Sequence, residues 1–207
     1  NKHSIVFHLG MSGRLRLYKK IEFKNNKHDH LLLKTNNGRI LIFNDPRRFG
    51  FIDYDLYKII DSRKYLTSLG IDALSTSLNG PYLFFKISKS IVPVKQILLN
   101  QKIVSGIGNI YASEILFNAK ISPLKRGKDI KLHDCDQICK STKIILKKAI
   151  NSGGSTLRDF VATDGTLGNF QSNFKVYNRQ GKKISGKIVK KIIQYGRSTY
   201  FCPFFQK

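Results

Sequence analysis

The apolar residues of this 207-residue chain change their spacing twice, and this change limits the folds that the chain can adopt. Up to about residue 70 they alternate, and HLLLKTNNGRILIFND places Asn36-Asn37-Gly38 between two apolar runs, which predicts a β-hairpin. From about Pro81 the spacing becomes helical, as in GIGNIYASEILFNA and CKSTKIILKKAINSGG. After Asp164 the runs FKVYN, KIVKKIIQY and STYFC alternate again. This order predicts an α+β, multidomain protein.

Charge adds a constraint on partners. The chain has 37 Lys and Arg against 13 Asp and Glu, a net charge of +24. A lysine-rich proteome could explain part of this excess, but it does not explain its distribution. No acidic residue follows Asp164, whereas many basic residues do: Lys175, Arg179, Lys182, Lys183, Lys187, Lys190, Lys191, Arg197 and Lys207. The basic tail predicts a surface that binds a polyanion, chiefly nucleic acid.

Other global features point to an intracellular protein. No apolar run approaches the roughly 18 residues of a membrane span, and the apolar run in NKHSIVFHLGMSG is too short for a signal peptide. The three cysteines, Cys135, Cys139 and Cys202, make no disulfide framework, which favours a reduced, cytoplasmic setting. The sole methionine is Met11, so we expect a fragment that starts within a strand.

The stretch GIGNIYASEILF suits a phosphate group. Gly106 and Gly108 allow close approach of a ligand to the backbone, and Asn109 stands where a helix begins. Backbone N–H groups at a helix start bind phosphate readily. The alternative is a tight turn between two core helices.

Two further stretches could enter a DNA base stack. In DPRRFG, Asp45-Pro46 fixes a turn that is followed by Arg47, Arg48 and Phe49. Guanidinium groups beside an aromatic ring could fill a gap in the stack. The alternative is a strand start with Phe49 in the core. In HLGMSG, Met11 stands between Gly10 and Ser12-Gly13, and the turn would direct its side chain outward.

Taken in order, these stretches resemble the formamidopyrimidine-DNA glycosylase family. The likeness covers nearly the whole chain: HLGMSG, KHDH, DPRRFG, LLNQKIVSGIGNIYASEILF, GGSTLRDF, and NFKVYNRQG through GRSTYFC. Related endonuclease VIII enzymes share the helical motif, but DPRRFG and FVATDGTLGNFQSNF look more like the formamidopyrimidine branch. The resemblance implies three domains. Residues 1–70 would be the C-terminal part of the N-terminal β-sandwich catalytic domain, residues 71–160 a helix–two-turn–helix domain, and residues 161–207 a lesion loop and a finger-like β-hairpin.

The resemblance also implies an activity and a place in the cell. It implies base-excision repair of damaged double-stranded DNA in bacteria, by a monomer that works in the cytoplasm at the nucleoid. The enzyme would flip oxidised purines such as 8-oxoguanine and formamidopyrimidines out of the duplex, cleave the glycosidic bond and act as an AP lyase.

Site residues follow from the matched motifs. Met11, Arg47 and Phe49 would fill the void and read the opposite base, and Asn109 with Arg197 would clamp phosphates around the flipped nucleotide. Arg197 would also take part in the last elimination step. Three further DNA contacts are implied: His28, Lys95 and Tyr177. We expect Met11, Arg47, Phe49, Asn109 and Arg197 to line one cleft between the β part and the helical part.

The chain departs from the family at its catalytic end. The family's nucleophile is an N-terminal proline amine, followed by a glutamate acid, and neither has a counterpart here. Pro46 and Pro93 are internal, so their nitrogens are tertiary amides that cannot form a Schiff base. We therefore expect the chain by itself to bind DNA without cleaving it.

The family's zinc finger is the second departure. Four cysteines usually hold zinc, but GKKISGK stands where the first pair would be, and Cys202 is the one cysteine of the second. A single thiolate cannot make a closed zinc site, so we expect no metal and no other cofactor. We expect a metal-free hairpin held by apolar packing of Ile188, Ile192, Tyr200, Phe201, Phe204 and Phe205. His133, Cys135 and Cys139 could form another metal site, although helix-packing thiols are the favoured interpretation.

Two other functions fit parts of the sequence. One is a non-enzymatic double-stranded DNA-binding protein that retains the wedge and the phosphate clamp. The other is a ribosome-associated basic protein, which would have no use for Met11, Arg47 and Phe49 on one surface.

Overall fold

The computed structural model describes residues 2–19, 24–155, 163 and 166–207, which belong to two compact units. Unit 1 comprises residues 1–67 and 151–172, and unit 2 comprises residues 68–150 and 173–207. The first boundary lies close to the expected one at residue 70. The C-terminal hairpin belongs to the helical unit, because its strands pack on a helix of that unit. The start of the expected lesion loop lies outside the described residues, apart from Thr163.

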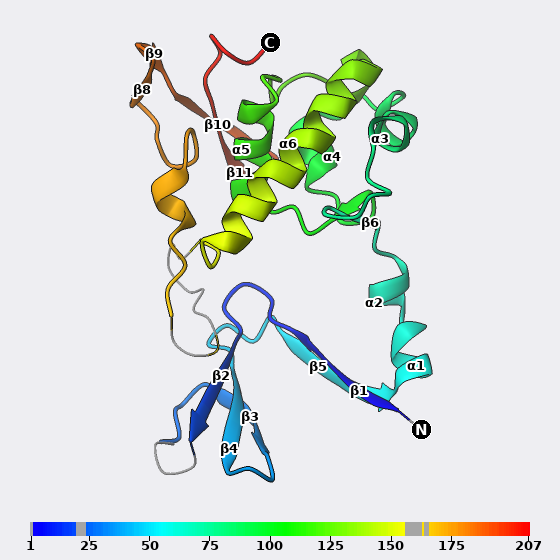
Figure 1. Ribbon diagram of the computed structural model, residues 1–207, viewed down its shortest axis with the longest axis vertical. Helices are drawn as coiled ribbons and strands as arrows, with labels where there is room; N and C mark the ends of the chain where they lie inside the picture. Colours follow the sequence, from blue (N-terminus) through cyan, green and yellow to red (C-terminus); the bar gives the residue numbers. More distant parts are fainter. Residues whose placement is uncertain (1, 20–23, 156–162, 164–165) are drawn as a thin grey trace. The chain divides into compact units, whose positions relative to one another are not determined.

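Unit 1 contains two antiparallel sheets (Figure 1). The first has the strand order β2-β4-β3, formed by β2 (Arg14–Lys19), β4 (Arg39–Asn44) and β3 (Asp29–Lys34). The second pairs β1 (His3–His8) with β5 (Phe51–Leu56). Two short helices follow β5, α1 (Tyr57–Asp61) and α2 (Lys64–Thr67).

The predicted hairpin at Asn36-Asn37-Gly38 joins β3 to β4 and is confirmed. Gly38 has a φ of 75°, a value that the tight turn requires and that glycine adopts without a steric penalty. The core of this sheet is formed by β4, where Ile40, Ile42 and Phe43 are buried. Strand β4 is central and paired on both sides, which fixes the turn that follows it.

Unit 2 is built from helices that share one core. They are α3 (Gly80–Ile87), α4 (Val94–Leu98), α5 (Asn109–Asn118) and α6 (Leu132–Asn151), with a 3-10 turn at Gly127–Asp129. A second 3-10 turn, Phe170–Asn173, crosses from unit 1 into unit 2. A short parallel pair links β6 (Ile71–Asp72) to β7 (Val104–Ser105). Helix α5 buries five consecutive residues, 112–116, so it is enclosed on all sides. No helix in the described part of the chain is both long and apolar enough to cross a membrane.

The thiols of α6 belong to its packed face. Cys135 and Cys139 are buried on the same side as Ile138 and Leu146. Burial raises the pKa of Cys135 to about 12 and that of Cys139 to about 11, so both stay protonated near neutral pH. Their environment is that of packing residues.

The tail forms two short hairpins. Their strands are β8 (Lys183–Ile184), β9 (Lys187–Ile188), β10 (Lys190–Gln194) and β11 (Arg197–Phe201). Strands β10 and β11 pair antiparallel beside α5 (Figure 1). The chain thus combines a β domain, a helical domain and C-terminal hairpins, as the α+β expectation states.

The core of the tail differs from the expected one. A buried cluster is formed by Val176, Val189 and Tyr200, with Phe117, Tyr177 and Ile184 packed against it. Two of the residues expected there, Ile188 and Phe204, are 53% and 58% exposed. Neighbouring residues of an extended chain point to opposite sides, so Val189 is buried and Ile188 is not. Phe204 instead lies under the ammonium of Lys187, 4.2 Å from its ring centroid.

Candidate nucleic-acid interface

In unit 1 the turn after β4 is organised by a buried carboxylate. Asp45 is 1% exposed, and its Oδ1 accepts from Ser12 Oγ at 2.6 Å and from the Arg47 amide at 3.3 Å. Its Oδ2 accepts from the Gly50 amide at 2.8 Å. The hydrogen bond from Ser12 is the main cause that lowers the pKa of Asp45, and it outweighs the opposing effect of burial. The carboxylate therefore fixes both ends of the DPRRFG turn.

This turn displays three of the predicted residues side by side. The Arg47 Cζ lies 4.7 Å from the centre of the Phe49 ring, and its Nη1 lies 3.7 Å from Met11 Sδ. Met11 is 68% exposed and Phe49 55% exposed. Gly10 is needed here, because a Cβ at its position would come within 2.8 Å of the Phe49 carbonyl carbon. The result is a cation flanked by two exposed apolar side chains.

His28 lies near the same turn. The His28 carbonyl accepts a hydrogen bond from the Asp45 amide at 3.0 Å, and His28 is partly exposed. His30, which the sequence analysis did not single out, has its Nε2 2.8 Å from the Asp45 carbonyl oxygen. Both histidines of KHDH thus border the carboxylate-centred turn.

In unit 2 a buried ammonium holds the other predicted pair. Lys95 of α4 has 0% exposure, and its Nζ donates to Asn109 Oδ1 at 2.6 Å, to Thr199 Oγ1 at 2.7 Å and to the Ser198 carbonyl at 3.0 Å. Burial is the main cause that lowers the pKa of Lys95 to about 8, and the charge of Arg197 adds to it. Lys95 therefore has no exposed surface with which to contact DNA in this structure, and it acts on its neighbours instead.

Asn109 and Arg197 are brought together through Ser198. Asn109 is the first residue of α5, and its Nδ2 donates to the Ser198 carbonyl at 3.0 Å. Arg197 precedes Ser198 at the start of β11 and is exposed. The helix start and the arginine are thus joined by one carbonyl group, which Lys95 also contacts.

A second buried ion, missed by the sequence analysis, anchors the tail to α5. Glu114 is 2% exposed, and its carboxylate accepts from the amides of Lys175, Val176 and Tyr177 at 2.8–3.0 Å. The signal in the sequence is an acid within an apolar helical run, SEILF, which needs a partner if it is buried. Tyr177 itself is partly buried, and its ring centre lies 5.0 Å from that of Tyr200.

At the position where the family usually holds zinc, this chain offers one buried cysteine. Cys202 is fully buried, and its amide donates to Gln206 Oε1 at 2.8 Å, while Gln206 Nε2 donates to the Ile121 carbonyl at 2.9 Å. The Gln206 amide thus closes the last turn of the chain. Among the described residues no three His, Cys, Asp or Glu side chains are grouped so that they could hold a metal ion.

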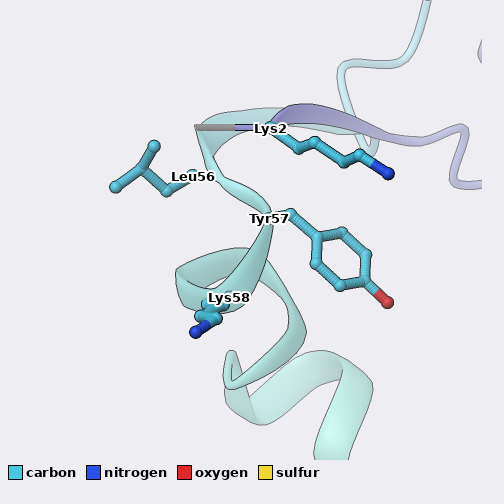
Figure 2. Close-up of a pocket in the computed structure, with 4 residues that line it drawn as sticks. All are labelled: Lys2, Leu56, Tyr57 and Lys58. Carbon is cyan, nitrogen blue, oxygen red and sulfur yellow. The ribbon is translucent and has the colours of Figure 1, made fainter.

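Each unit also has hollows of its own. In unit 1 a hollow of about 330 Å³ is lined by Lys2, Leu56, Tyr57 and Lys58, and Figure 2 shows Lys2 and Tyr57 extending to one side of the backbone with Leu56 on the other. No carboxylate lines it, so it offers no acidic partner for proton transfer. The hollow adds basic surface to this unit.

The predicted residues thus form two groups. Met11, Arg47 and Phe49 form a contiguous exposed cluster in unit 1, and Lys95, Asn109 and Arg197 surround Ser198 in unit 2. That both groups face one duplex stays a prediction.

Comparisons with known proteins match both units. The family model of the formamidopyrimidine-DNA glycosylase N-terminal domain matches residues 1–52, and that of the formamidopyrimidine-DNA glycosylase H2TH domain matches residues 69–161. Formamidopyrimidine-DNA glycosylase of Rickettsia africae is 40% identical, covering 100% of this chain and 76% of the relative. The enzyme of the same name from Zymomonas mobilis is 42% identical, covering 99% and 75%.

Solved structures agree with these relatives. A mutant Lactococcus lactis Fpg in complex with DNA containing Fapy-dG has a TM-score of 0.90 at 32% identity, covering 99% of this chain and 75% of that one. MutM (Fpg) from Thermus thermophilus has a TM-score of 0.88 at 34% identity, covering 99% and 76%. Both the sequence and the fold lead to the same assignment: the chain belongs to the formamidopyrimidine-DNA glycosylase family.

Proposed function

We propose that the protein is a base-excision-repair DNA glycosylase with AP-lyase activity that acts on oxidised purines, such as 8-oxoguanine and formamidopyrimidines, in bacterial nucleoid DNA. Support comes from membership of the family, from the net charge of +24, and from the relatives solved with damaged DNA. The single observation that carries the proposal is the exposed arginine of unit 1 held between Met11 and Phe49.

The cluster suits the space that a flipped nucleotide leaves behind. Extruding a nucleotide costs a few kcal/mol of stacking and pairing, and a wedge that fills the void offsets part of that cost. Met11 and Phe49 supply apolar contact for the neighbouring bases, and the Arg47 guanidinium between them can donate to the base that has lost its partner. The buried Asp45 keeps the three side chains in place before DNA arrives.

The second group suits the phosphates beside the flipped nucleotide. Arg197 is exposed and can bind a phosphate through two parallel hydrogen bonds, while Asn109 lies at a helix start. In the elimination step the bond between the sugar and the 3′ phosphate breaks, and the phosphate leaves as an anion that a guanidinium stabilises. Lys95 positions both groups through Ser198.

The 207 residues by themselves are proposed to bind damaged duplex without cleaving the glycosidic bond. All five prolines are internal, and their nitrogens are tertiary amides that cannot attack a sugar carbon. We propose that the finger works without metal, because Cys202 is buried, its amide is hydrogen-bonded to Gln206, and it belongs to no group of three potential metal ligands in the described part of the chain.

Arg47→Ala tests the proposed function, with the adjacent Arg48→Ala as its matched control. Both variants lose one positive charge from the same turn, but among the described contacts only Arg47 reaches Met11 and Phe49. Duplex with a tetrahydrofuran abasic analogue and the same duplex without damage are titrated in filter-binding assays. We expect Arg47→Ala to weaken binding to the damaged duplex by roughly tenfold more than binding to the intact one. Arg48→Ala should weaken both alike.

An equal loss on the two duplexes for Arg47→Ala would contradict the wedge role. It would leave the second candidate, a non-enzymatic binder of double-stranded DNA. Borohydride trapping of the protein expressed from its natural gene, on abasic duplex, separates the two functions. A covalent adduct supports the lyase, and tight binding without an adduct supports the binder.

A further inference from the structure

The two hairpins of the tail turn through the same unusual geometry with different residues. Strands β8 and β9 are joined by Ser185 and Gly186, with φ values of 45° and 77°, and strands β10 and β11 by Tyr195 and Gly196, with φ values of 48° and 73°. Two-residue turns with positive φ at both positions favour Asn-Gly, because Asn tolerates this region and Gly has no Cβ. A bulky aromatic residue there is an outlier.

No hydrogen bond or ring contact within the described residues offsets the backbone strain at Tyr195. Tyr195 is 72% exposed, and its ring and hydroxyl have no partner within the described residues. Ser185 shows that the same turn forms with a small side chain. A strained, exposed aromatic residue on a fixed turn is therefore a candidate for contact with another molecule.

The base of the turn is held firmly. Gln194, directly before Tyr195, is 7% exposed, and its Oε1 accepts from Thr199 Oγ1 at 2.8 Å. Its Nε2 donates to the Pro123 carbonyl at 3.3 Å, and its own carbonyl accepts from Gln96 Nε2 at 3.3 Å. The ring thus projects from a rigid support, so little conformational freedom is lost when it binds.

The residues around Tyr195 indicate what kind of molecule it contacts. Arg197 lies two residues away and pairs with Gln194 across the turn, and β10 adds Lys190 and Lys191. A basic surface with a protruding ring is typical of proteins that bind nucleic-acid strands, where the charges hold phosphates and the ring stacks on a base or sugar. No acidic residue of the tail opposes this partner.

We propose that Tyr195 is a further DNA-binding residue, which packs its ring on the nucleotide adjoining the phosphate that Arg197 binds. The proposal rests on the proposed function, because it takes damaged duplex as the partner. It assigns the ring to the sugar or base, whereas the tail lysines act on phosphates alone. Binding through Tyr195 should therefore tolerate sequence changes and respond weakly to salt.

Tyr195→Asn tests the proposal, since it replaces the ring with the residue that this turn prefers. We expect the thermal midpoint to stay equal or rise, while affinity for the abasic duplex falls by roughly tenfold, the size of one aromatic stacking contact. The slope of affinity against salt should not change, because no charge is lost. Tyr195→Phe should bind as the unaltered chain does.

Ser185→Asn is the matched control. It makes the same improvement in the other turn and should leave DNA affinity unchanged. An unaltered affinity in Tyr195→Asn would overturn the proposal, and so would an equal loss in Ser185→Asn. A lower thermal midpoint together with weaker binding in Tyr195→Asn would assign Tyr195 a structural role and would also overturn it.

A spectroscopic test is available because the chain has no tryptophan. Tyr195→Trp places a single fluorophore at the turn, and its emission should be quenched and shifted when abasic duplex is added. Phe85→Trp, at a 79% exposed position on α3, is the control that should not respond. A silent Tyr195→Trp that still binds DNA would refute the contact.

Arg197→Ala separates failure of this proposal from failure of the proposed function. If Arg197→Ala loses affinity while Tyr195→Asn does not, the phosphate clamp stands and the Tyr195 contact is refuted. If the unaltered chain does not prefer the abasic duplex, both the proposed function and the Tyr195 contact are refuted.

Discussion

The two arginine-bearing tips of the molecule are each organised by one buried ion, and the two ions have opposite charge. In unit 1 the carboxylate of Asp45 collects N–H and O–H donors beneath Arg47. In unit 2 the ammonium of Lys95 collects oxygen acceptors beneath Arg197. An anion under one arginine lowers the local positive charge, whereas a cation near the other raises it.

The two ions also differ in how stable their charge is. Hydrogen bonds from Ser12 and the backbone keep Asp45 ionised despite burial, and its pKa is lowered. Burial and Arg197 work against the charge of Lys95, and its pKa falls to about 8. Asp45 should therefore keep its charge around neutral pH, whereas Lys95 should begin to lose its charge near pH 8.

The largest expected effect is that of Lys95→Met. It removes the charge and leaves Asn109, Ser198 and Thr199 without their common donor. Each buried acceptor left unsatisfied costs roughly 1–3 kcal/mol of folding stability. Because Asn109 and Ser198 lose the group that holds them in place, we expect affinity for damaged and intact duplex to fall by roughly 30-fold. Fluorescence anisotropy measures this loss. Lys128→Met, at an exposed lysine, is the control for charge alone, and an equal loss in that variant would contradict a positioning role.

Asp45→Ala should affect only the other tip. The change leaves the donors of Ser12, Arg47 and Gly50 without their acceptor, so the free energy of unfolding should fall by about 2–4 kcal/mol. Preference for the damaged duplex should disappear, while binding to intact duplex, which depends on phosphate contacts, should persist. Urea titration and filter binding test these outcomes. If Asp45→Ala is still folded at the assay temperature but no longer binds intact duplex, the two tips are not independent.

How much the sequence could predict differs between the two tips. The two loops depend on local signals, an Asp-Pro pair and glycines near Met11, so the exposure of Met11 could be predicted. For Phe49 the motif alone left a core position open, and only the family resemblance favoured exposure. The burial of Lys95 could not, because its acceptors Ser198 and Thr199 lie 103 and 104 residues later in the chain. A lysine in PVKQILLN looks like any exposed lysine until those acceptors are known.

The tail shows a related limit. The hairpin between KIVKKIIQY and STYFC could be predicted from the alternation, but its core could not, because Ile188 and Val189 are both apolar neighbours. Apolar character alone does not decide which of two adjacent residues faces inward. The bonds from the tail amides of residues 175–177 to Glu114 also span 61 to 63 residues, so the sequence does not reveal how this part of the tail packs on α5.

A pH titration should separate the two ions by a moderate effect. The folded pKa of Lys95 is about 8 and its ordinary value is 10.5, so between these values the unfolded chain binds more protons than the folded one. The contribution of Lys95 to stability therefore rises with pH across this window. DNA affinity should fall across the same window, by several-fold and at most tenfold per pH unit, because phosphate binds more tightly when Lys95 is protonated.

The control for this titration is Lys95→Met, which should lack the step in affinity above pH 8. Asp45 gives the opposite case, since a lowered carboxyl pKa adds stability that is present above its ordinary value of 3.8 and is lost as pH falls through the folded value. A step above pH 8 that persists in Lys95→Met would assign the titration to another group.

The smallest expected effect is that of a metal chelator, and it bears on how the clamp of unit 2 is supported. If Arg197 is held by Lys95, Glu114 and the Val176–Val189–Tyr200 cluster, then EDTA or phenanthroline should change neither the melting temperature nor DNA affinity. Val189→Ala is the positive control: Val189 is 1% exposed, so its truncation should cost about 2 kcal/mol. Elemental analysis showing one zinc per chain, or a chelator effect as large as that of Val189→Ala, would mean that a metal supplies the support assigned to side-chain packing.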